Sequence, residues 1–302
     1  YMRHHGRISL HSNILYTILV VGFVYTLHYT MPTYIASSFL GQFTGETNVG
    51  YIYILGSITT ILGFMSMGSI LSRFGNKMTA LWLIVLQAFL CYGIITTESF
   101  PMLVTYFVIQ MAILAMIGFS MDVFVEAYSD VQHVGGIRGL YLTVTSAAWI
   151  LGPLISGAIV DGDRYQRVYI AAFGLLVVLF YLVQKNFNKF HDPKYPHITM
   201  FRTLRHVLLN KDLSRVFIAN IILQSFYAWM VIYTPIYLHK KIEILWEDIG
   251  IVFTIMLLPF VIFQLPAGKL ADKKWGEKEL MAIGFAIMGI STFLITYIQT
   301  SN

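Results

Sequence analysis

The stretch Gly268-Lys269-Leu270-Ala271-Asp272-Lys273-Lys274-Trp275-Gly276-Glu277-Lys278 lies between two long apolar runs and has an earlier counterpart. The counterpart, Gly68-Ser69-Ile70-Leu71-Ser72-Arg73-Phe74-Gly75-Asn76-Lys77, begins 200 residues earlier and is also flanked by apolar runs. The same offset relates Val49-Gly50 to Ile249-Gly250. A repeat of this length indicates a duplicated half of a protein, because the units of solenoid proteins are several-fold shorter.

The composition of the chain indicates that most of it is surrounded by lipid. Of the 302 residues, 57% are hydrophobic and only 12% are charged, whereas a water-soluble domain carries roughly 25% charged residues. A membrane-spanning helix needs about 20 mostly apolar residues, and the alternation typical of barrel strands is absent. We therefore expect an all-α polytopic membrane protein in contact with the lipid bilayer. Nine spans are predicted, at 13–38, 49–71, 78–97, 101–121, 139–160, 167–184, 214–238, 247–270 and 279–298.

The formal net charge of +5 is explained by membrane orientation rather than by nucleic-acid binding. If the N-terminus is cytoplasmic and the spans alternate, sixteen of the twenty Lys and Arg residues fall on the cytoplasmic side. This bias follows the positive-inside rule. We expect a multi-pass protein of the plasma (inner) membrane with a cytoplasmic N-terminus and no nucleic-acid partner. The four basic residues on the outer side are Arg164, Arg167, Lys240 and Lys241.

The spans fall into two unequal groups. Six precede a polar, basic connection and three follow it, which predicts an N-terminal six-helix bundle at 1–184, a cytoplasmic linker at 185–212 and an incomplete C-terminal bundle at 213–302. The second group repeats only half of the first, so the sequence is interpreted as a fragment that lacks the matching C-terminal helices. Within the linker, residues 198–209 are expected to form an amphipathic helix on the membrane surface, where basic side chains favour anionic lipids.

The two repeated loops resemble the signature loop of the major facilitator superfamily, Gly-x-x-x-Asp-(Arg/Lys)-x-Gly-x-(Arg/Lys). The first copy has Ser72 in place of the aspartate, and the second has one residue inserted before its last glycine. All nine spans follow the family's order, which implies two pseudo-symmetric helical bundles. The matching residues are Gly68, Arg73, Gly75 and Lys77 in the first copy and Gly268, Asp272, Lys273, Gly276 and Lys278 in the second.

The fifth predicted span resembles the family's helix-five motif, which is associated mostly with proton-coupled exporters. It keeps Gly152, Pro153 and Gly157, with Ser156 in place of a glycine. A Gly-Pro pair inside a helix removes one hydrogen bond and permits a bend, so these residues form a candidate hinge. The family's helix-four arginine has no evident counterpart, and the nearest polar residue in that span is Gln110.

The resemblance also implies a role for the loop aspartate, which latches one conformation by meeting the positive N-terminus of a helix in the other half. Asp272 is then expected to face Arg138 and Gly139 at the start of helix five. Such a contact contributes roughly 0.3–2 kcal/mol, which is enough to bias two conformations without locking either. Ser72 lacks the charge, so the first latch should be weaker.

In the family, helices one, four and seven line the substrate cavity. This implies a set of candidate lining residues: Tyr25, His28, Gln110, Gln224 and Tyr227. For His28 two interpretations stay open, because the ring either binds substrate or a proton or is hydrogen-bonded between helices. The Tyr and Gln side chains either line the cavity or pack between helices. Asp122 and Glu126 share a helix face near the cytoplasmic end, and are either functional carboxylates or a solvated end or partners of Arg138.

These features predict secondary active transport of a small-molecule substrate by alternating access, with a proton-coupled exporter or antiporter as one form. The alternative is a non-transporting membrane receptor or scaffold on a transporter fold. The motifs His-Glu-x-x-His and Gly-x-Ser-x-Gly are absent, so we predict no enzyme, no catalytic residues, no metal site and no cofactor. A monomer is expected. The sequence does not define the substrate, the direction of transport or the coupling ion.

Overall fold

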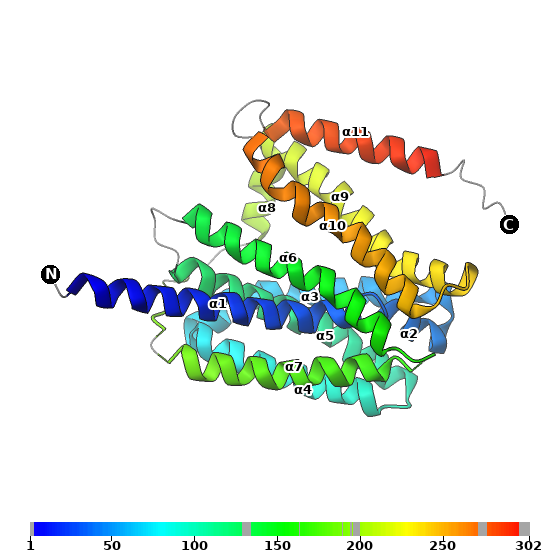
Figure 1. Ribbon diagram of the computed structural model, residues 1–302, viewed down its shortest axis with the longest axis horizontal. Helices are drawn as coiled ribbons and strands as arrows, with labels where there is room; N and C mark the ends of the chain where they lie inside the picture. Colours follow the sequence, from blue (N-terminus) through cyan, green and yellow to red (C-terminus); the bar gives the residue numbers. More distant parts are fainter. Residues whose placement is uncertain are drawn as a thin grey trace. The chain divides into compact units, whose positions relative to one another are not determined.

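The computed structural model describes residues 3–128, 134–162, 164–188, 190–193, 195, 200–270 and 277–295. Within them the chain forms eleven α-helices and one π-helical turn, and no strand is assigned (Figure 1). The elements are α1 (Arg3–Thr33), α2 (Ala36–Thr44), α3 (Glu46–Phe74), α4 (Asn76–Thr96), α5 (Phe100–Tyr128), α6 (Val134–Ile159), α7 (Gln166–Asn186), α8 (Met200–Leu209), α9 (Lys211–Ile236), η1 (Tyr237–Lys241), α10 (Trp246–Leu270) and α11 (Glu277–Ile295).

Eight helical segments in the described residues are long and apolar enough to cross a membrane. Each segment overlaps one of the first eight predicted spans. The ninth predicted span, 279–298, overlaps α11, whose described residues end at Ile295. The expectation of an all-α polytopic membrane protein is thus confirmed. The eight segments are Ile14–Thr44, Asn48–Phe74, Asn76–Thr96, Phe100–Tyr128, Gly139–Ile159, Gln166–Asn186, Lys211–Lys241 and Trp246–Phe263.

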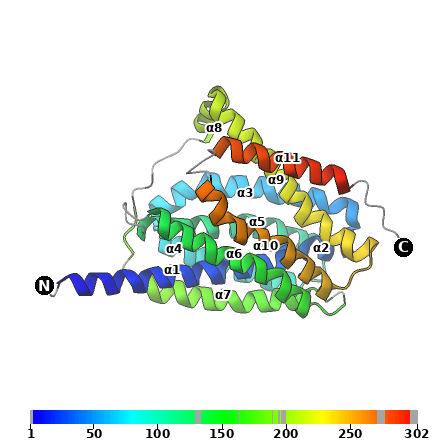
Figure 2. The ribbon, with the colours of Figure 1, turned by 45° about the horizontal axis from the view of Figure 1, so that its top comes forward.

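The chain forms two compact units, Tyr1–Thr254 and Ile255–Asn302. In the first unit α1 lies between α6 and α7 and packs against both (Figures 1 and 2). Close packing also joins α3 to α5, α4 to α5 and α4 to α7. The predicted boundaries near residues 184 and 213 are not tested by this division and stay a prediction.

The first unit is apolar both inside and outside. Ile84, Ile117 and Leu176 form part of its core and are at most 1% exposed, whereas Trp82 and Phe89 on α4 are 65% and 60% exposed. In water such large apolar surfaces would favour aggregation. In lipid they have no such cost, because helix association there depends on close packing rather than on hiding apolar groups from water.

The first span is broken where the sequence contains Pro32. Helix α1 ends at Thr33 and α2 begins at Ala36, with Ile35 N–H donating to the Pro32 carbonyl over 3.2 Å. Proline has no N–H to donate to the preceding turn, which explains why the helix ends here. The break places the short α2 against α3 and α9.

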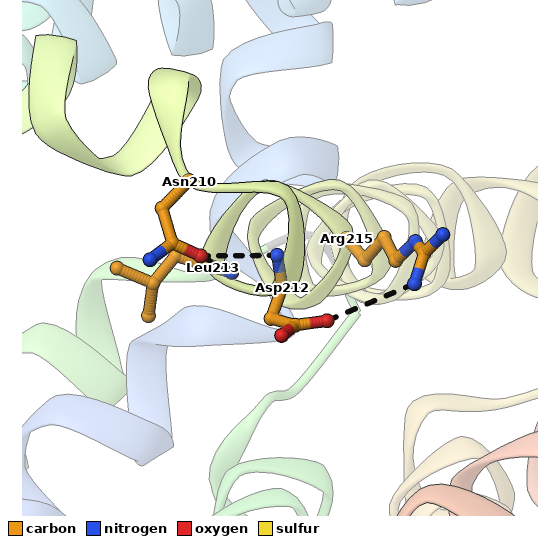
Figure 3. Close-up of polar contacts among 4 residues, drawn as sticks. All are labelled: Asn210, Asp212, Leu213 and Arg215. Carbon is orange, nitrogen blue, oxygen red and sulfur yellow. Dashed lines mark hydrogen bonds and ion pairs between the residues drawn. The ribbon is translucent and has the colours of Figure 1, made fainter.

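The linker contains the predicted amphipathic helix, which is α8. The chain turns at Asn210 before α9 begins, and the Asn210 Oδ1 accepts the N–H groups of Asp212 and Leu213 at 3.1 and 3.2 Å (Figure 3). This side chain is an N-cap, which satisfies donors that have no partner inside the helix. The N-cap therefore fixes the point where the linker ends and the seventh span starts.

The second unit comprises the rest of α10 and α11. Its described side chains are largely exposed, including Ile262, Phe263, Ile287 and Phe293. Residues of the second signature loop fall mostly outside the described part of the chain. Asp272, Lys273 and Gly276 are among those residues, while Gly268 lies in α10 and Lys278 near the start of α11.

Candidate functional site

A cavity of about 360 Å³ lies between α1, α3 and α5. On α5 its lining positions recur every three or four residues, so that they form one stripe along the helix. The stripe runs from Met111 to Asp122. The nine lining residues are Tyr25, Tyr29, Phe64, Met111, Leu114, Ala115, Gly118, Phe119 and Asp122.

Two tyrosines of α1 form one wall of this cavity, and both are held by neighbouring helices. The Tyr25 hydroxyl donates to the Leu114 carbonyl over 2.7 Å. A Cβ atom at Gly118 would lie 2.8 Å from the same hydroxyl, so the glycine makes room for the ring. Tyr29 packs edge-to-face against Trp149 of α6, with ring centroids 5.4 Å apart. The two rings are therefore positioned before any ligand binds.

Tyr25 is the only one of the five sequence-derived candidates that lines this cavity. His28, only 1% exposed, has its Nδ1 2.9 Å from the Ala172 carbonyl and its Nε2 3.3 Å from Gln87 Nε2. A carbonyl can only accept, so Nδ1 donates and Nε2 accepts. In this structure the ring joins α1 to α4 and α7, which corresponds to the second of the two interpretations left open for it.

The other three candidates lie elsewhere. Gln110 is 4% exposed on α5, and within the described residues its Oε1 has no hydrogen-bond partner. On α9, Gln224 is exposed and Tyr227 is half-buried beside Phe226. The lining residues that sequence reasoning missed include Tyr29, Phe64 and Phe119. Phe119 lies three residues before Asp122 on α5, and so on the same side of the helix, but the sequence alone gives no reason to choose that side.

Helix α6 carries the candidate hinge, and its last two turns contact the first turns of α10. A Cβ atom at Gly157 would lie 2.5 Å from the Trp246 carbonyl oxygen, and one at Gly250 would lie 2.7 Å from the Pro153 carbonyl oxygen. The Thr254 hydroxyl donates to the Ile150 carbonyl over 3.2 Å. The helices thus meet backbone to backbone, which only small residues permit.

The other residues of this motif contact α1. Gly152 leaves room for the Thr30 side chain, whose hydroxyl donates to the Ala148 carbonyl over 3.1 Å. The Ser156 hydroxyl donates to the Met31 carbonyl over 2.6 Å. The serine that replaces a motif glycine therefore joins α6 to α1 instead of opening space between them.

Aromatic rings cover the same end of the unit. Tyr34 of α1 lies 4.5 Å from Phe253 and 6.3 Å from Trp149, measured between ring centroids. Tyr165, just before α7, packs edge-to-face against Trp246 at 5.4 Å. Together with the glycine contact, these rings close the α6–α10 junction to solvent.

The first signature loop is held by a carboxylate from the linker. Gly75 has a φ of +72°, a conformation that glycine adopts without strain, and the Asn76 N–H that follows donates to Asp192 Oδ1 over 2.6 Å. Lys77 donates to the Asn188 side-chain oxygen. Ser72, at the aspartate position, donates to the Ser69 carbonyl of its own helix instead.

Tyr195 donates to the same carboxylate oxygen, Asp192 Oδ1, over 2.6 Å. Partial burial, and then the neighbouring carboxylate, raise the pKa of Tyr195 above its ordinary value. Sequence reasoning did not single out Asp192. Its position in a polar linker, far from the loop in sequence, gave no signal.

The second signature loop and its expected partner stay a prediction. Asp272 lies outside the described residues, and of Arg138 only the backbone in α6 is described. Gly139 lies in α6 with open space around it. In the described residues no group of three or more His, Cys, Asp or Glu side chains could hold a metal ion.

The comparisons with known proteins agree with this architecture. The family model described as Major Facilitator Superfamily matches residues 15–302. A similar solved structure is the crystal structure of a D-xylose-proton symporter, with a TM-score of 0.63 and 14% sequence identity over 85% of this chain and 69% of that one. At this identity the likeness concerns the fold alone. No curated protein matches the sequence.

Proposed function

Since the chain belongs to the major facilitator superfamily, we propose that it moves a small solute across a lipid bilayer by alternating access, as a secondary active transporter. In such transporters two bundles rock about a site near the middle of the membrane. The observation that carries the proposal is the contact of Gly157 with Gly250. It joins a helix of the first repeat to a helix of the second, at one end of the unit that holds the cavity.

This contact has the properties of a gate. It is built from backbone atoms, one hydroxyl and aromatic rings, without interlocking long side chains. Separating α6 from α10 would therefore break few directional interactions, and dispersion contacts between atoms are individually weak. A gate held in this way can open and close at a moderate cost in free energy, as alternating access requires.

Asp192 gives the two signature loops different roles in the proposal. It anchors the first loop within its own bundle, through the Asn76 N–H. The residue at the family's latch position in that loop, Ser72, has no charge to offer the other half. We infer that the charged latch between the halves depends on the second loop, with Asp272 facing the start of α6 at Arg138 and Gly139.

Orientation and coupling belong to the same proposal. The distribution of Lys and Arg supports a cytoplasmic N-terminus in the plasma membrane. The helix-five motif supports a proton-coupled exporter, and the similar solved structure is that of a D-xylose-proton symporter. A proton is accordingly the first coupling ion to test, with solute transport measured in both directions. We expect the transporting unit to be a monomer.

The proposal is tested by uptake into vesicles that contain the purified protein, with a panel of labelled solutes and an imposed proton gradient. Gly157→Leu should reduce the flux of any transported solute at least about tenfold, because its side chain would collide with the Trp246 carbonyl. The matched control is Gly174→Leu on α7, where nothing lies within 4 Å of an added Cβ atom. Equal flux from both variants would contradict the gate.

A further inference from the structure

We propose that the cavity between α1, α3 and α5 takes a compact organic monocation, such as a quaternary or protonated amine with an apolar body. The cation would lie against aromatic rings and be attracted by the Asp122 carboxylate. This inference rests on the proposed function, because it takes the cavity as the transport site.

The lining of the cavity has the chemistry that organic cations require. Four of its nine residues are aromatic, namely Tyr25, Tyr29, Phe64 and Phe119, and one is charged, namely Asp122. The face of an aromatic ring attracts a cation, and the attraction is strongest where water is excluded. Met111 and Leu114 supply apolar surface for the body of the ligand.

The position of Asp122 on α5 adds a second argument. It lies one turn beyond Phe119 and Gly118, on the same stripe that lines the cavity. Asp122 is exposed near the end of α5, and an ionisable side chain that borders a cavity between membrane helices is a candidate contact for a charged ligand. Asp122 also interacts with other groups of the chain, so an incoming cation would join or exchange with these interactions.

The same lining does not suit a polyhydroxylated solute. A sugar needs several polar partners placed around it, and the polar side-chain groups of this cavity are two tyrosine hydroxyls and one carboxylate. One of these hydroxyls, that of Tyr25, already donates to the Leu114 carbonyl. The fold that the chain shares with a D-xylose-proton symporter therefore does not imply that this cavity binds a sugar.

The test measures binding to the full chain in lipid nanodiscs, with benzyltrimethylammonium as the cation. Dimethylbenzylcarbinol, a neutral molecule of nearly the same shape, is the comparison ligand. Asp122→Asn should weaken binding of the cation about tenfold or more and leave the carbinol unchanged, because only the charge pair is lost. The matched control is Glu126→Gln, one turn further along α5 and exposed but not part of the lining.

A second variant keeps the proposal falsifiable if Asp122→Asn does not fold. Phe64→Leu keeps an apolar side chain but removes a ring face, and should weaken the cation several-fold more than the carbinol. The proposal is overturned if the protein binds the cation no more tightly than the carbinol. It is also overturned if Asp122→Asn and Phe64→Leu both leave cation binding unchanged. If the protein transports a solute and Gly157→Leu abolishes that flux, but the protein binds no cation, this inference is overturned and the proposed transport stands. Asp122-dependent cation binding without flux of any solute would support this inference and count against the proposed transport.

Discussion

At the residue scale, Asp192 is the side chain that most changes the interpretation of the sequence. Its carboxylate accepts the Asn76 N–H at the start of α4, at a point where Gly75 leaves no side chain in the way. A carboxylate at a helix N-terminus satisfies a free donor and meets the positive end of the helix dipole. The linker thereby holds the first signature loop.

We expect Asp192→Ala to destabilise the folded protein by about 1 kcal/mol, the usual value for a lost N-cap. Asp192→Asn should cost less, because it keeps an acceptor and loses only the charge. Thermal unfolding of the purified protein in one detergent measures both variants. Glu98→Ala, which removes an exposed carboxylate in the α4–α5 connection, serves as the control. If Asp192→Ala unfolds at the same midpoint temperature as this control, Asp192 does not cap α4.

The cavity shows how far a single sequence determines residue roles. Tyr25 borders the cavity between α1, α3 and α5, but Gln110 does not, although Met111 beside it does. The expectation that Tyr25 and Gln110 line the substrate cavity stays a prediction. Successive residues of a helix are about 100° apart, so neighbours in sequence point to different sides. In a water-soluble helix the polar face would reveal the orientation. Here α5 is apolar on all sides, as expected for a buried membrane helix, so the sequence does not say which face borders the cavity.

At the scale of elements, the spans were predictable because length and apolar composition alone define a membrane helix. The linker helix was also predictable, and α8 at Met200–Leu209 confirms it. The contact of α6 with α10 was not predictable from the sequence, because the pairing of distant helices depends on where small residues meet. Gly157 belongs to the helix-five motif and Gly250 to the repeat, but nothing in the sequence pairs the two, and their contact is seen only in three dimensions.

The surface chemistry of α8 leads to a prediction about lipids. Leu204 and Leu208 are 37% and 56% exposed, and Arg202 and Arg205 on the same helix are also exposed. One residue after Asn210 the seventh span begins (Figure 3), so α8 adjoins the membrane boundary. Basic side chains near an anionic leaflet contribute about 1 kcal/mol each.

We therefore expect nanodiscs of phosphatidylglycerol to raise the unfolding temperature relative to phosphatidylcholine, and the double change Arg202→Gln and Arg205→Gln to remove most of that rise. The control is Lys240→Gln with Lys241→Gln, two exposed charges at the other end of the α9–η1 segment. A rise that survives the arginine changes, or that the lysine changes remove equally, would show that α8 does not bind anionic lipid.

At the scale of the whole molecule, the duplicated sequence and the glycine contact support the same mechanism. If the two repeats rock against each other, the junction of Gly157 with Gly250 must separate in part of the population. Spin labels at Ser99→Cys and Lys241→Cys would report this opening, because both positions are exposed and lie in different repeats. The single native cysteine, Cys91, is buried and is replaced by serine in the labelled protein.

The expected result is two populations of the distance between the labels, short and long. Gly157→Leu should shift the distribution towards the long population, since a leucine at the contact opposes closure, and Gly174→Leu should leave it unchanged. A transported solute should change the ratio of the two populations, because a ligand shifts a conformational equilibrium by its difference in affinity for the two states. One narrow distance that neither the leucine nor the solute alters would mean that the junction is permanent, and α6 and α10 would then form a static core instead of a gate.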